Sequence, residues 1–375
     1  MEVEIGNYMQ NFGPDRRVKN KWVLQGLKRL GVEVLNVAES DIDGLMAQGV
    51  DFNQDDRFIS ANLNSSKTNS PLLKPYVVKQ ISLPGNQTKF RLGFLGLSSR
   101  EASYKTDEKG YLWADPMVSA KRWIPELRKK CDFLILLACM PSKDSIQLAV
   151  DNPDVDVILN GFKHQWSDPP AKVNQSTIIY AEDEGRILGE LRLRIAGKEK
   201  AEANSVNHTL TKVVKDDPEM AAFVARAKEE ITAQQQSLAN EKPLKTASSE
   251  LLANSPFLTA KSCESCHATA YEVWQHSKHS KAIEILKQVK REFDSSCVGC
   301  HTTGKGKVGG FEDLNQTPEL ANVQCESCHG PGRAHGTNPA ESKMLKLNSS
   351  ACLECHTRSN SPDFDFATYW PKVKH

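Results

Sequence analysis

The feature that most constrains this chain is a five-residue pattern, Cys-x-x-Cys-His, which occurs four times after residue 260. Of the ten cysteines in the 375 residues, only Cys131 and Cys139 lie outside these motifs. A disulfide framework would not place every remaining cysteine in a CxxC pair followed by histidine. The four motifs are Cys263–His267, Cys297–His301, Cys325–His329 and Cys352–His356.

Each motif has the residues that attach a haem covalently. Its two thiols add to the vinyl groups of the porphyrin as thioethers, and the histidine that follows binds the iron. We therefore predict four covalent c-type haems that replace most of a hydrophobic core. The predicted attachment residues are Cys263, Cys266, Cys297, Cys300, Cys325, Cys328, Cys352 and Cys355, and the predicted iron ligands are His267, His301, His329 and His356.

The alternative is zinc, because eight cysteines in CxxC pairs could build two Cys₄ sites. Zinc sites do not require a histidine after every second cysteine, however. Only ten of the 375 residues are histidine, so four coincidences are very improbable. Haem is therefore the favoured interpretation, and no other metal is expected.

A second histidine is needed wherever an iron has two imidazole ligands. Outside the motifs, the C-terminal region offers only His276, His279, His335 and His375. His335 follows a Gly/Pro-rich segment that would let it approach a haem closely. Each could instead be an ordinary surface histidine, and for His276 this is favoured, because it lies three residues from His279 on the same predicted helix face. A haem without a second histidine would be five-coordinate and open to a small ligand.

Several segments after residue 260 share a family pattern: CESCH…YEVW…SKHSKA, then CVGCH, CESCHGPGRAH and CLECH…SPDFDF..YW…H. In this pattern residues 261–375 resemble the tetrahaem cytochrome c-554 family. The resemblance implies that His279, His335 and His375 are the second iron ligands. It also implies that the haem of His301 lacks a strong second ligand from the protein, and that the region is an electron carrier with closely packed haems.

The first half of the chain alternates strand-like and helix-like segments, which indicates an α/β domain with a largely parallel sheet. A hairpin is expected from Thr177–Ala181 and Ile187–Ile195. A charged helix is expected at Asp216–Leu238 and a polar linker at 240–254. The expected strands are Val34–Ala38, Phe90–Leu97, Phe133–Cys139 and Val155–Asn160, and the expected helices are Arg17–Leu30, Pro116–Lys129 and Ser142–Val150.

The order of these segments is similar to the metallophosphoesterase domain of periplasmic 5′-nucleotidases, an α/β sandwich. Its metal ligands lie at strand ends in the motifs DxH, GD, GNHE, SH and GHxH, and they hold two ions that activate water. Here DxH would precede residue 1. The other four motifs fall at Gly6-Asn7, Ala38–Asp41, Ala138-Cys139 and Gly161–His164.

Almost all of the required ligands are missing at these positions, so the resemblance implies the fold without its phosphoesterase chemistry. His164 is expected to be structural. The alternative is a different alignment and a different site, but the chain contains no GxGxxG, no P-loop and no convincing nucleophile triad. The expected organisation is a degenerate 5′-nucleotidase-like domain at 1–198, a helix and linker at 199–258, and a mainly helical and irregular tetrahaem domain at 259–375.

Composition excludes some partners and leaves the compartment to be argued from chemistry. A net charge of +1 gives no indication of nucleic-acid binding, and no apolar run approaches the length of a transmembrane helix. The first residues do not read as a signal peptide. Haem attachment to CxxCH nevertheless occurs outside the cytoplasm, so we expect a periplasmic or otherwise extracytoplasmic protein whose sequence here is incomplete at its N-terminus.

Electron transfer between redox protein partners is the favoured function, and the oligomeric state stays open. One alternative is a multihaem redox enzyme acting on a small nitrogen or sulfur substrate at the haem of His301. No cluster of acid or base groups stands out at residues 297–310 to support it. A nucleotidase with an attached cytochrome is the other alternative, and the missing metal ligands make it the weakest.

Overall fold

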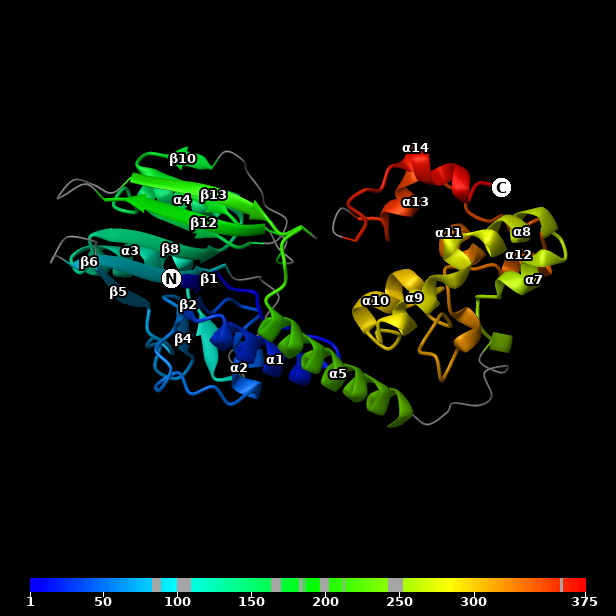
Figure 1. Ribbon diagram of the computed structural model, residues 1–375, viewed down its shortest axis with the longest axis horizontal. Coiled ribbons are helices and arrows are strands. Elements are labelled where there is room, and N and C mark those ends of the chain that lie inside the picture. The colour runs from blue at the N-terminus through cyan, green and yellow to red at the C-terminus, as the bar shows by residue number, and fades with distance from the viewer. Residues whose placement is uncertain are drawn as a thin grey trace. The chain divides into compact units, whose positions relative to one another are not determined.

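The computed structural model describes residues 1–82, 89–99, 109–162, 170–181, 185, 187–195, 202–211, 213–241, 252–357 and 360–375. The chain forms two compact units, residues 1–218 and 219–375 (Figure 1). His164 and most of the expected linker lie outside the described residues. In the part of the chain that is described, no helix has the length and hydrophobicity to cross a membrane.

The first unit is built on a six-stranded sheet with the order β10-β11-β9-β8-β6-β5. Its four inner strands are parallel, and β5 and β10 pair antiparallel at the two edges. This confirms the largely parallel sheet. The strands are β5 (Tyr76–Ser82), β6 (Lys89–Ser98), β8 (Phe133–Cys139), β9 (Val157–Asn160), β10 (Ala171–Val173) and β11 (Ser176–Tyr180).

A second layer packs on one face of this sheet. It comprises the parallel strands β1 (Glu2–Glu4), β2 (Val32–Asn36) and β3 (Phe58–Ile59), and the antiparallel pair β12 (Ile187–Arg194) and β13 (Glu202–Thr209). A core cluster joins the layers, in which Val34 and Ile59 are buried with Phe94, Phe133 and Leu137. A further pair, β4 (Leu63–Ser65) and β7 (Tyr111–Trp113), lies at the side.

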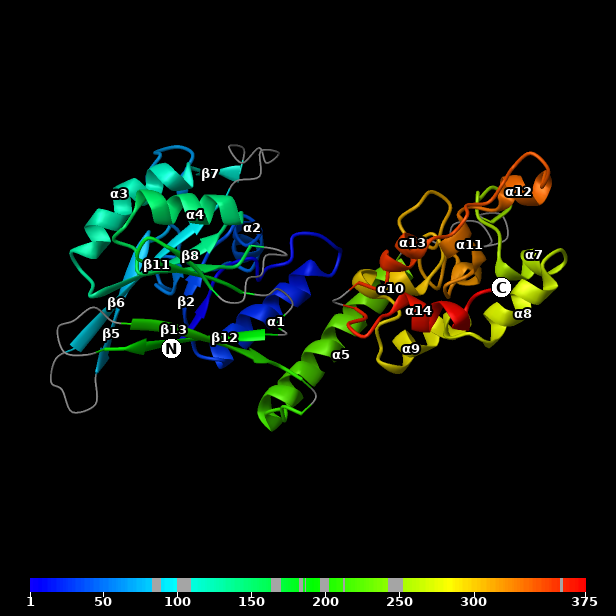
Figure 2. The same cartoon turned by 90° about the horizontal axis from the view of Figure 1, so that it is seen from above.

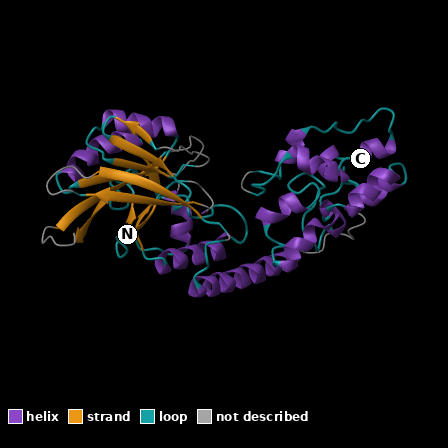
Figure 3. Cartoon of the chain, turned by 45° about the horizontal axis from the view of Figure 1, so that its top comes forward, coloured by secondary structure: helices purple, strands orange, loops and turns teal. Residues whose placement is uncertain are grey.

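Helices cover the outer face of the six-stranded sheet and the β1–β3 part of the second layer (Figures 2 and 3). α3 (Pro116–Arg128) and α4 (Ser142–Asp151) bury Ile124 and Leu148 against the six-stranded sheet. α1 (Arg16–Arg29) and α2 (Ile42–Ala47) belong to a separate cluster with β2. The result is the predicted α/β sandwich, with four layers.

The predicted hairpin was wrong. β11 pairs with β9 and β10, whereas β12 pairs along its whole length with β13. The residues of β13, EANSVNHT, are mostly polar, so they lack the apolar alternation that predicts a strand. The other predicted strands and helices of this unit are present, and β8 has the predicted bounds because all seven of its residues are buried.

The second unit begins with the predicted charged helix, α5 (Pro218–Glu241), whose Thr232 hydroxyl donates to the carbonyl of Lys290 over 2.8 Å. Short helices and loops follow, around a small core that includes Phe257, Phe311 and Leu320. The helices are α7 (Ala260–Glu264), α8 (Ala268–His276), η3 (Lys278–Lys281), α9 (Ala282–Gln288), α10 (Ser295–His301), η4 (Pro318–Leu320), α11 (Cys325–His329), α12 (Arg333–Thr337), α13 (Ser349–Leu353), α14 (Phe366–Tyr369) and η5 (Trp370–Lys372).

Candidate functional site

Each CxxCH motif starts on a short helix of the second unit: α7, α10, α11 or α13. A helical turn places cysteines three residues apart on the same side, which suits attachment to one porphyrin edge. The turn continues into the histidine, because the amides of His267 and His356 donate to the carbonyls of Cys263 and Cys352 over 2.9 Å. The local structure therefore fits covalent haem attachment.

Three of the four motif histidines face a histidine from elsewhere in the unit. The ring centroids of His267 and His335 are 6.2 Å apart, with 27° between the ring planes. A protein-bound metal ion lies about 2 Å from an imidazole nitrogen, which puts two imidazoles that share it about 6 Å apart. The other two pairs are His279 with His356 at 6.2 Å and His329 with His375 at 5.8 Å.

Hydrogen bonds fix the orientation of most of these rings. In a neutral ring, an Nδ1 that donates to a carbonyl oxygen carries the proton, and the lone pair of Nε2 can then bind a metal. The contacts of this kind are His329 with Leu345 at 3.1 Å, His335 with Ser342 at 2.7 Å, and His375 with Val373 at 3.1 Å.

The pair of His279 and His356 is distinguished by its burial. Burial lowers the pKa of both imidazoles, and interaction with His356 lowers that of His279 further. The ring of His356 stacks on Phe364 at 4.6 Å, and its Nδ1 lies 2.9 Å from the hydroxyl of Ser361. Burial therefore favours the neutral form of both rings, which is the form that binds metal.

His301 differs from the other motif histidines. Its Nδ1 donates to the carbonyl of Ala282 over 2.7 Å, but no histidine among the described residues stacks on it. His276, which was expected to be an ordinary surface residue, is exposed and contacts the carbonyl of Glu272 in its own helix. It takes part in none of the three pairs.

The cysteines of different motifs also come together. Cys263 in the first motif lies close enough to Cys325 in the third to raise the pKa of its thiol, and Cys355 in the fourth motif lies similarly close to Cys300 in the second. Cys328 and Cys352 are close enough to influence each other electrostatically. In space, the first motif therefore lies next to the third, the third next to the fourth, and the fourth next to the second. Sequence spacing could not reveal this order, because consecutive motifs are separated by similar lengths of chain.

In the first unit, the positions assigned to the phosphoesterase motifs also converge. The side-chain amide of Asn7 donates to the sulfur of Cys139 over 2.8 Å, and the hydroxyl of Ser40 donates to the side-chain oxygen of Asn7 over 2.6 Å. The Cys139 thiol in turn lies 3.9 Å from the carbonyl of Gly161. These four positions lie at or just beyond the carboxyl ends of β1, β2, β8 and β9, as the resemblance implied.

A direct hydrogen-bond network therefore joins side chains where the family has metal ligands. Across the described ranges, no group of three or more His, Cys, Asp or Glu side chains could hold a metal ion. Asp41, beside this network, is completely buried and accepts the amides of Asn7, Met9 and Ala38 over 2.8–2.9 Å. Burial raises its pKa from 3.8 to about 7, against the effect of these amides. Cys131 and Cys139 are both buried, and neither is part of a disulfide.

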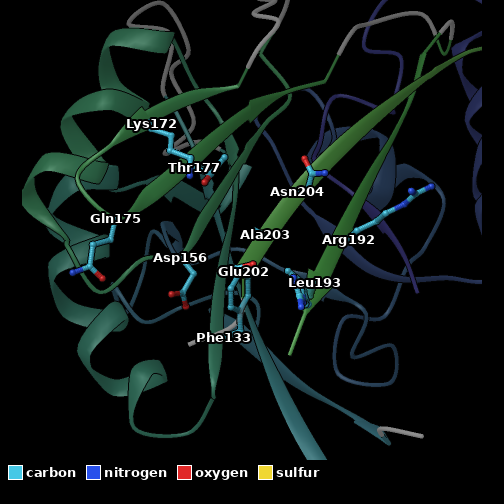
Figure 4. Close-up of a pocket in the computed structure, with 11 residues that line it drawn as sticks. Phe133, Asp156, Lys172, Gln175, Thr177, Arg192, Leu193, Glu202, Ala203 and Asn204 are labelled. Carbon is cyan, nitrogen blue, oxygen red and sulfur yellow. The ribbon is translucent and has the colours of Figure 1, made fainter. Parts of the chain in front are cut away.

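A pocket of about 680 Å³ lies elsewhere in the first unit, where β8 and β11 begin (Figure 4). Phe133 lies in its wall together with Thr177, Leu193 and Ala203. The carboxylate of Asp156, which also lines it, is held by Arg128 at 2.7 Å. The pocket is at the opposite strand ends from Cys139, so it does not correspond to the phosphoesterase site.

Residues 262–330 match the family model described as "Cytochrome c554 and c-prime". The chain is 41% identical over 103 residues to cytochrome c-554 of Nitrosomonas europaea, a match that covers 24% of this chain and 44% of that protein. It is 24% identical over 123 residues to the 2′,3′-cyclic-nucleotide 2′-phosphodiesterase/3′-nucleotidase of Salmonella typhimurium, covering 28% of this chain and 19% of that protein. The chain thus spans less than half the length of these relatives.

One solved structure supports the fold of the first unit. The sulfate thiohydrolase SoxB of Thermus thermophilus matches 71% of this chain and 49% of its own, with a TM-score of 0.50 and 15% identity. A 5′-nucleotidase precursor from the same organism matches 64% and 49%, with a TM-score of 0.48 and 18% identity. The N-terminal part therefore has the fold of 5′-nucleotidase-like metallophosphoesterases.

Proposed function

We propose that this chain, whose C-terminal region carries a cytochrome c554 domain with covalently bound haem c, transfers electrons through four haems. Haems held by these residues would supply one-electron redox chemistry. The protein supplies the attachment cysteines, the iron ligands and the spacing between neighbouring sites. The three histidine pairs carry this proposal.

The pairs support the proposal because each joins one motif histidine to one histidine outside the motifs. Three independent pairs have centroid distances of 5.8–6.2 Å, and all three outer histidines are those implied by the family resemblance. Surface histidines have no reason to approach a CxxCH motif in this geometry. We infer that His335, His279 and His375 are the second ligands of the irons bound by His267, His356 and His329, respectively.

The contacts between cysteines support transfer along a chain of sites. Because Cys263 meets Cys325, Cys328 lies near Cys352, and Cys355 meets Cys300, the four attachment sites form a continuous series. Its ends are the sites of His267 and His301. Redox protein partners that exchange electrons at the two ends would suit this arrangement, and no feature indicates nucleic acid.

A second candidate function is redox catalysis on a small nitrogen or sulfur compound at the site of His301. One observation favours it: within the described ranges, His301 has no stacked histidine partner. An open site at one end of the series could receive a small ligand. The carrier function requires no further residues, however, whereas catalysis requires acid or base groups placed beside this site.

For the first unit we propose a scaffold role without phosphoesterase activity. The contacts of Asn7 with Cys139 and Ser40 support this, because these side chains bind one another at the positions of metal ligands. A two-metal site needs carboxylate and imidazole ligands at those places. We also propose a periplasmic or otherwise extracytoplasmic location, since covalent haem attachment to CxxCH takes place there.

The test is spectroscopy and intact mass of the purified holoprotein. The mass is expected to exceed that of the polypeptide by four haems, and electron paramagnetic resonance should show three low-spin sites and one high-spin site. Replacing His279, His335 or His375 by alanine should convert one further site to high spin, whereas His276→Ala serves as the matched control and should convert none. A protein without haem, or one with four unaltered sites in all three variants, would contradict the proposal.

A further inference from the structure

The pentapeptide CESCH occurs twice in this chain, and its glutamate has two very different environments. In the first motif, Glu264 is half-buried, with a side chain that is 37% exposed, and it pairs with Lys261 on the same helical turn. In the third motif, Glu326 is only 2% exposed. An identical local sequence thus places one carboxylate in a surface ion pair and the other in the interior. The difference must come from what surrounds the third motif.

The buried carboxylate of Glu326 is bonded to two separate segments. Its Oε1 accepts the amides of Leu258 and Gly332 over 2.8 and 2.6 Å, and its Oε2 also lies 2.9 Å from the amide of Leu258. Leu258 stands two residues before α7, the helix of the first motif. Gly332 is the N-cap residue of α12, the helix of His335. One side chain therefore joins three elements.

Those two segments carry both histidines of a single pair. α7 leads directly to His267, and α12 contains His335, whose ring lies 6.2 Å away. Glu326 contacts neither ring. It belongs instead to the motif of His329, which pairs with His375. Glu326 belongs to the third motif, but its hydrogen bonds link the two segments that carry His267 and His335.

Arg333 holds the same segment from the other side. Its amide donates to the carbonyl of Pro256 over 3.0 Å, and its guanidinium donates to the carbonyls of Leu252 and Ser255. The backbone that leads into α7 is therefore bound directly by Arg333, the first residue of α12, and is linked to Gly332 through the carboxylate of Glu326. Space is also limited here, because a Cβ atom on Gly332 would lie 3.1 Å from Oε1 of Glu326.

Burial of a carboxyl group costs free energy unless hydrogen bonds replace its water. Here backbone amides do so, and charge-assisted bonds of this kind are short and strong. Removal of the carboxyl would leave the buried amides of Leu258 and Gly332 without their acceptor, a costly state that is relieved when the segments separate. The separation would move His335 away from His267.

We propose that Glu326 is a positioning residue for the iron site of the first motif, which holds His335 opposite His267. The inference rests on the proposed function, since it concerns the second ligand of one haem. It assigns two roles to one pentapeptide: both copies attach haem, but only the glutamate of the third motif controls the coordination of a neighbouring site.

The test compares Glu326→Ala with Glu264→Ala in the full-length holoprotein, using intact mass and electron paramagnetic resonance. In E326A, four haems should remain attached and the high-spin content should double, from one site to two. E264A should keep the wild-type spectrum. The new high-spin signal should match that of His335→Ala, and the double variant E326A/H335A should add nothing to H335A. General destabilisation would not convert one selected site.

Glu326→Asp covers the case in which E326A does not accumulate. Aspartate retains the charge but is one methylene shorter, so it cannot reach both amides. We expect partial conversion of the same site to high spin. Four haems with an unaltered spectrum in E326A or E326D would overturn the inference, while leaving the proposed function intact. Absence of haem from the wild-type protein would instead refute the proposed function itself.

Discussion

The buried carboxyl of Asp41 should make the first unit less stable as pH rises. Asp41 is completely buried at the N-cap position of α2, next to the contact between Asn7 and Ser40. Two effects oppose each other there, because burial disfavours the charged carboxylate whereas three backbone amides favour it. Burial dominates, so the pKa in the folded state is about 7.

The direction and size of the effect follow from this pKa. The folded state binds the proton more tightly than the unfolded state, whose carboxyl has the ordinary pKa of 3.8. The resulting stabilisation is complete below the unfolded pKa and is lost as pH rises through about 7. At about 1.4 kcal/mol for each pKa unit, the free energy of unfolding should fall by up to about 4 kcal/mol between pH 4 and pH 8.

The assay should report on the first unit within the intact chain. Urea-dependent hydrogen exchange, followed by mass spectrometry of peptides from β2 and β8, separates this unit from the haem-bearing one. Asp41→Asn provides the comparison, because asparagine is nearly isosteric and does not titrate. The wild-type protein should lose stability from pH 5 to pH 8, and D41N should lose much less. A wild-type stability that rises with pH in this range would show that the three amides, and not burial, set the pKa.

Three further predictions concern packing and haem. Leu136 is fully buried in β8, so Leu136→Ala should lower the free energy of unfolding of the first unit by about 2–5 kcal/mol. The same exchange experiment measures this loss, and a loss below about 1 kcal/mol would contradict the packing. Gly310→Ala should destabilise the second unit by about 1–3 kcal/mol or more, because its Cβ atom would lie 1.9 Å from the carbonyl oxygen of Gly304. Thermal unfolding measures this loss, and an unaltered transition would contradict the close approach of Gly304 and Gly310. Replacement of all eight motif cysteines by serine should prevent haem attachment. Because the hydrophobic core of the second unit is small, this unit should then show no cooperative unfolding by circular dichroism. A cooperative transition would refute the prediction.

The sequence alone was sufficient to predict the strands of the first unit that are strongly apolar. β8 could be bounded to the residue because seven consecutive side chains are buried. β13 could not be found, because its residues are polar and only its pairing with β12 makes it a strand. The hairpin prediction failed for this reason: the true partner of β12 lacked a strand signal, so β11 was paired with it instead.

For the candidate site, sequence predicted the residue types and the structure added their arrangement. The four motifs and the three outer histidines were identifiable from pattern and resemblance, but the partner of each outer histidine depends on tertiary contacts between distant segments. The role inferred for Glu326 was beyond reach for the same reason. Two identical pentapeptides cannot be distinguished until the amides of Leu258 and Gly332 are seen to converge on one of them.

The order of neighbouring motifs has a consequence for how such a chain is completed during synthesis. The first two motifs to be synthesised, those of Cys263 and Cys300, are not neighbours in space. The neighbour of each belongs to a part of the chain that is synthesised later. Cys325 provides the neighbour of the first. The fourth motif then supplies neighbours to both the second and the third through Cys355 and Cys352. A chain that ended shortly after His329 would therefore leave the second motif without a neighbouring motif. The residues after His329 are needed to complete the series of four.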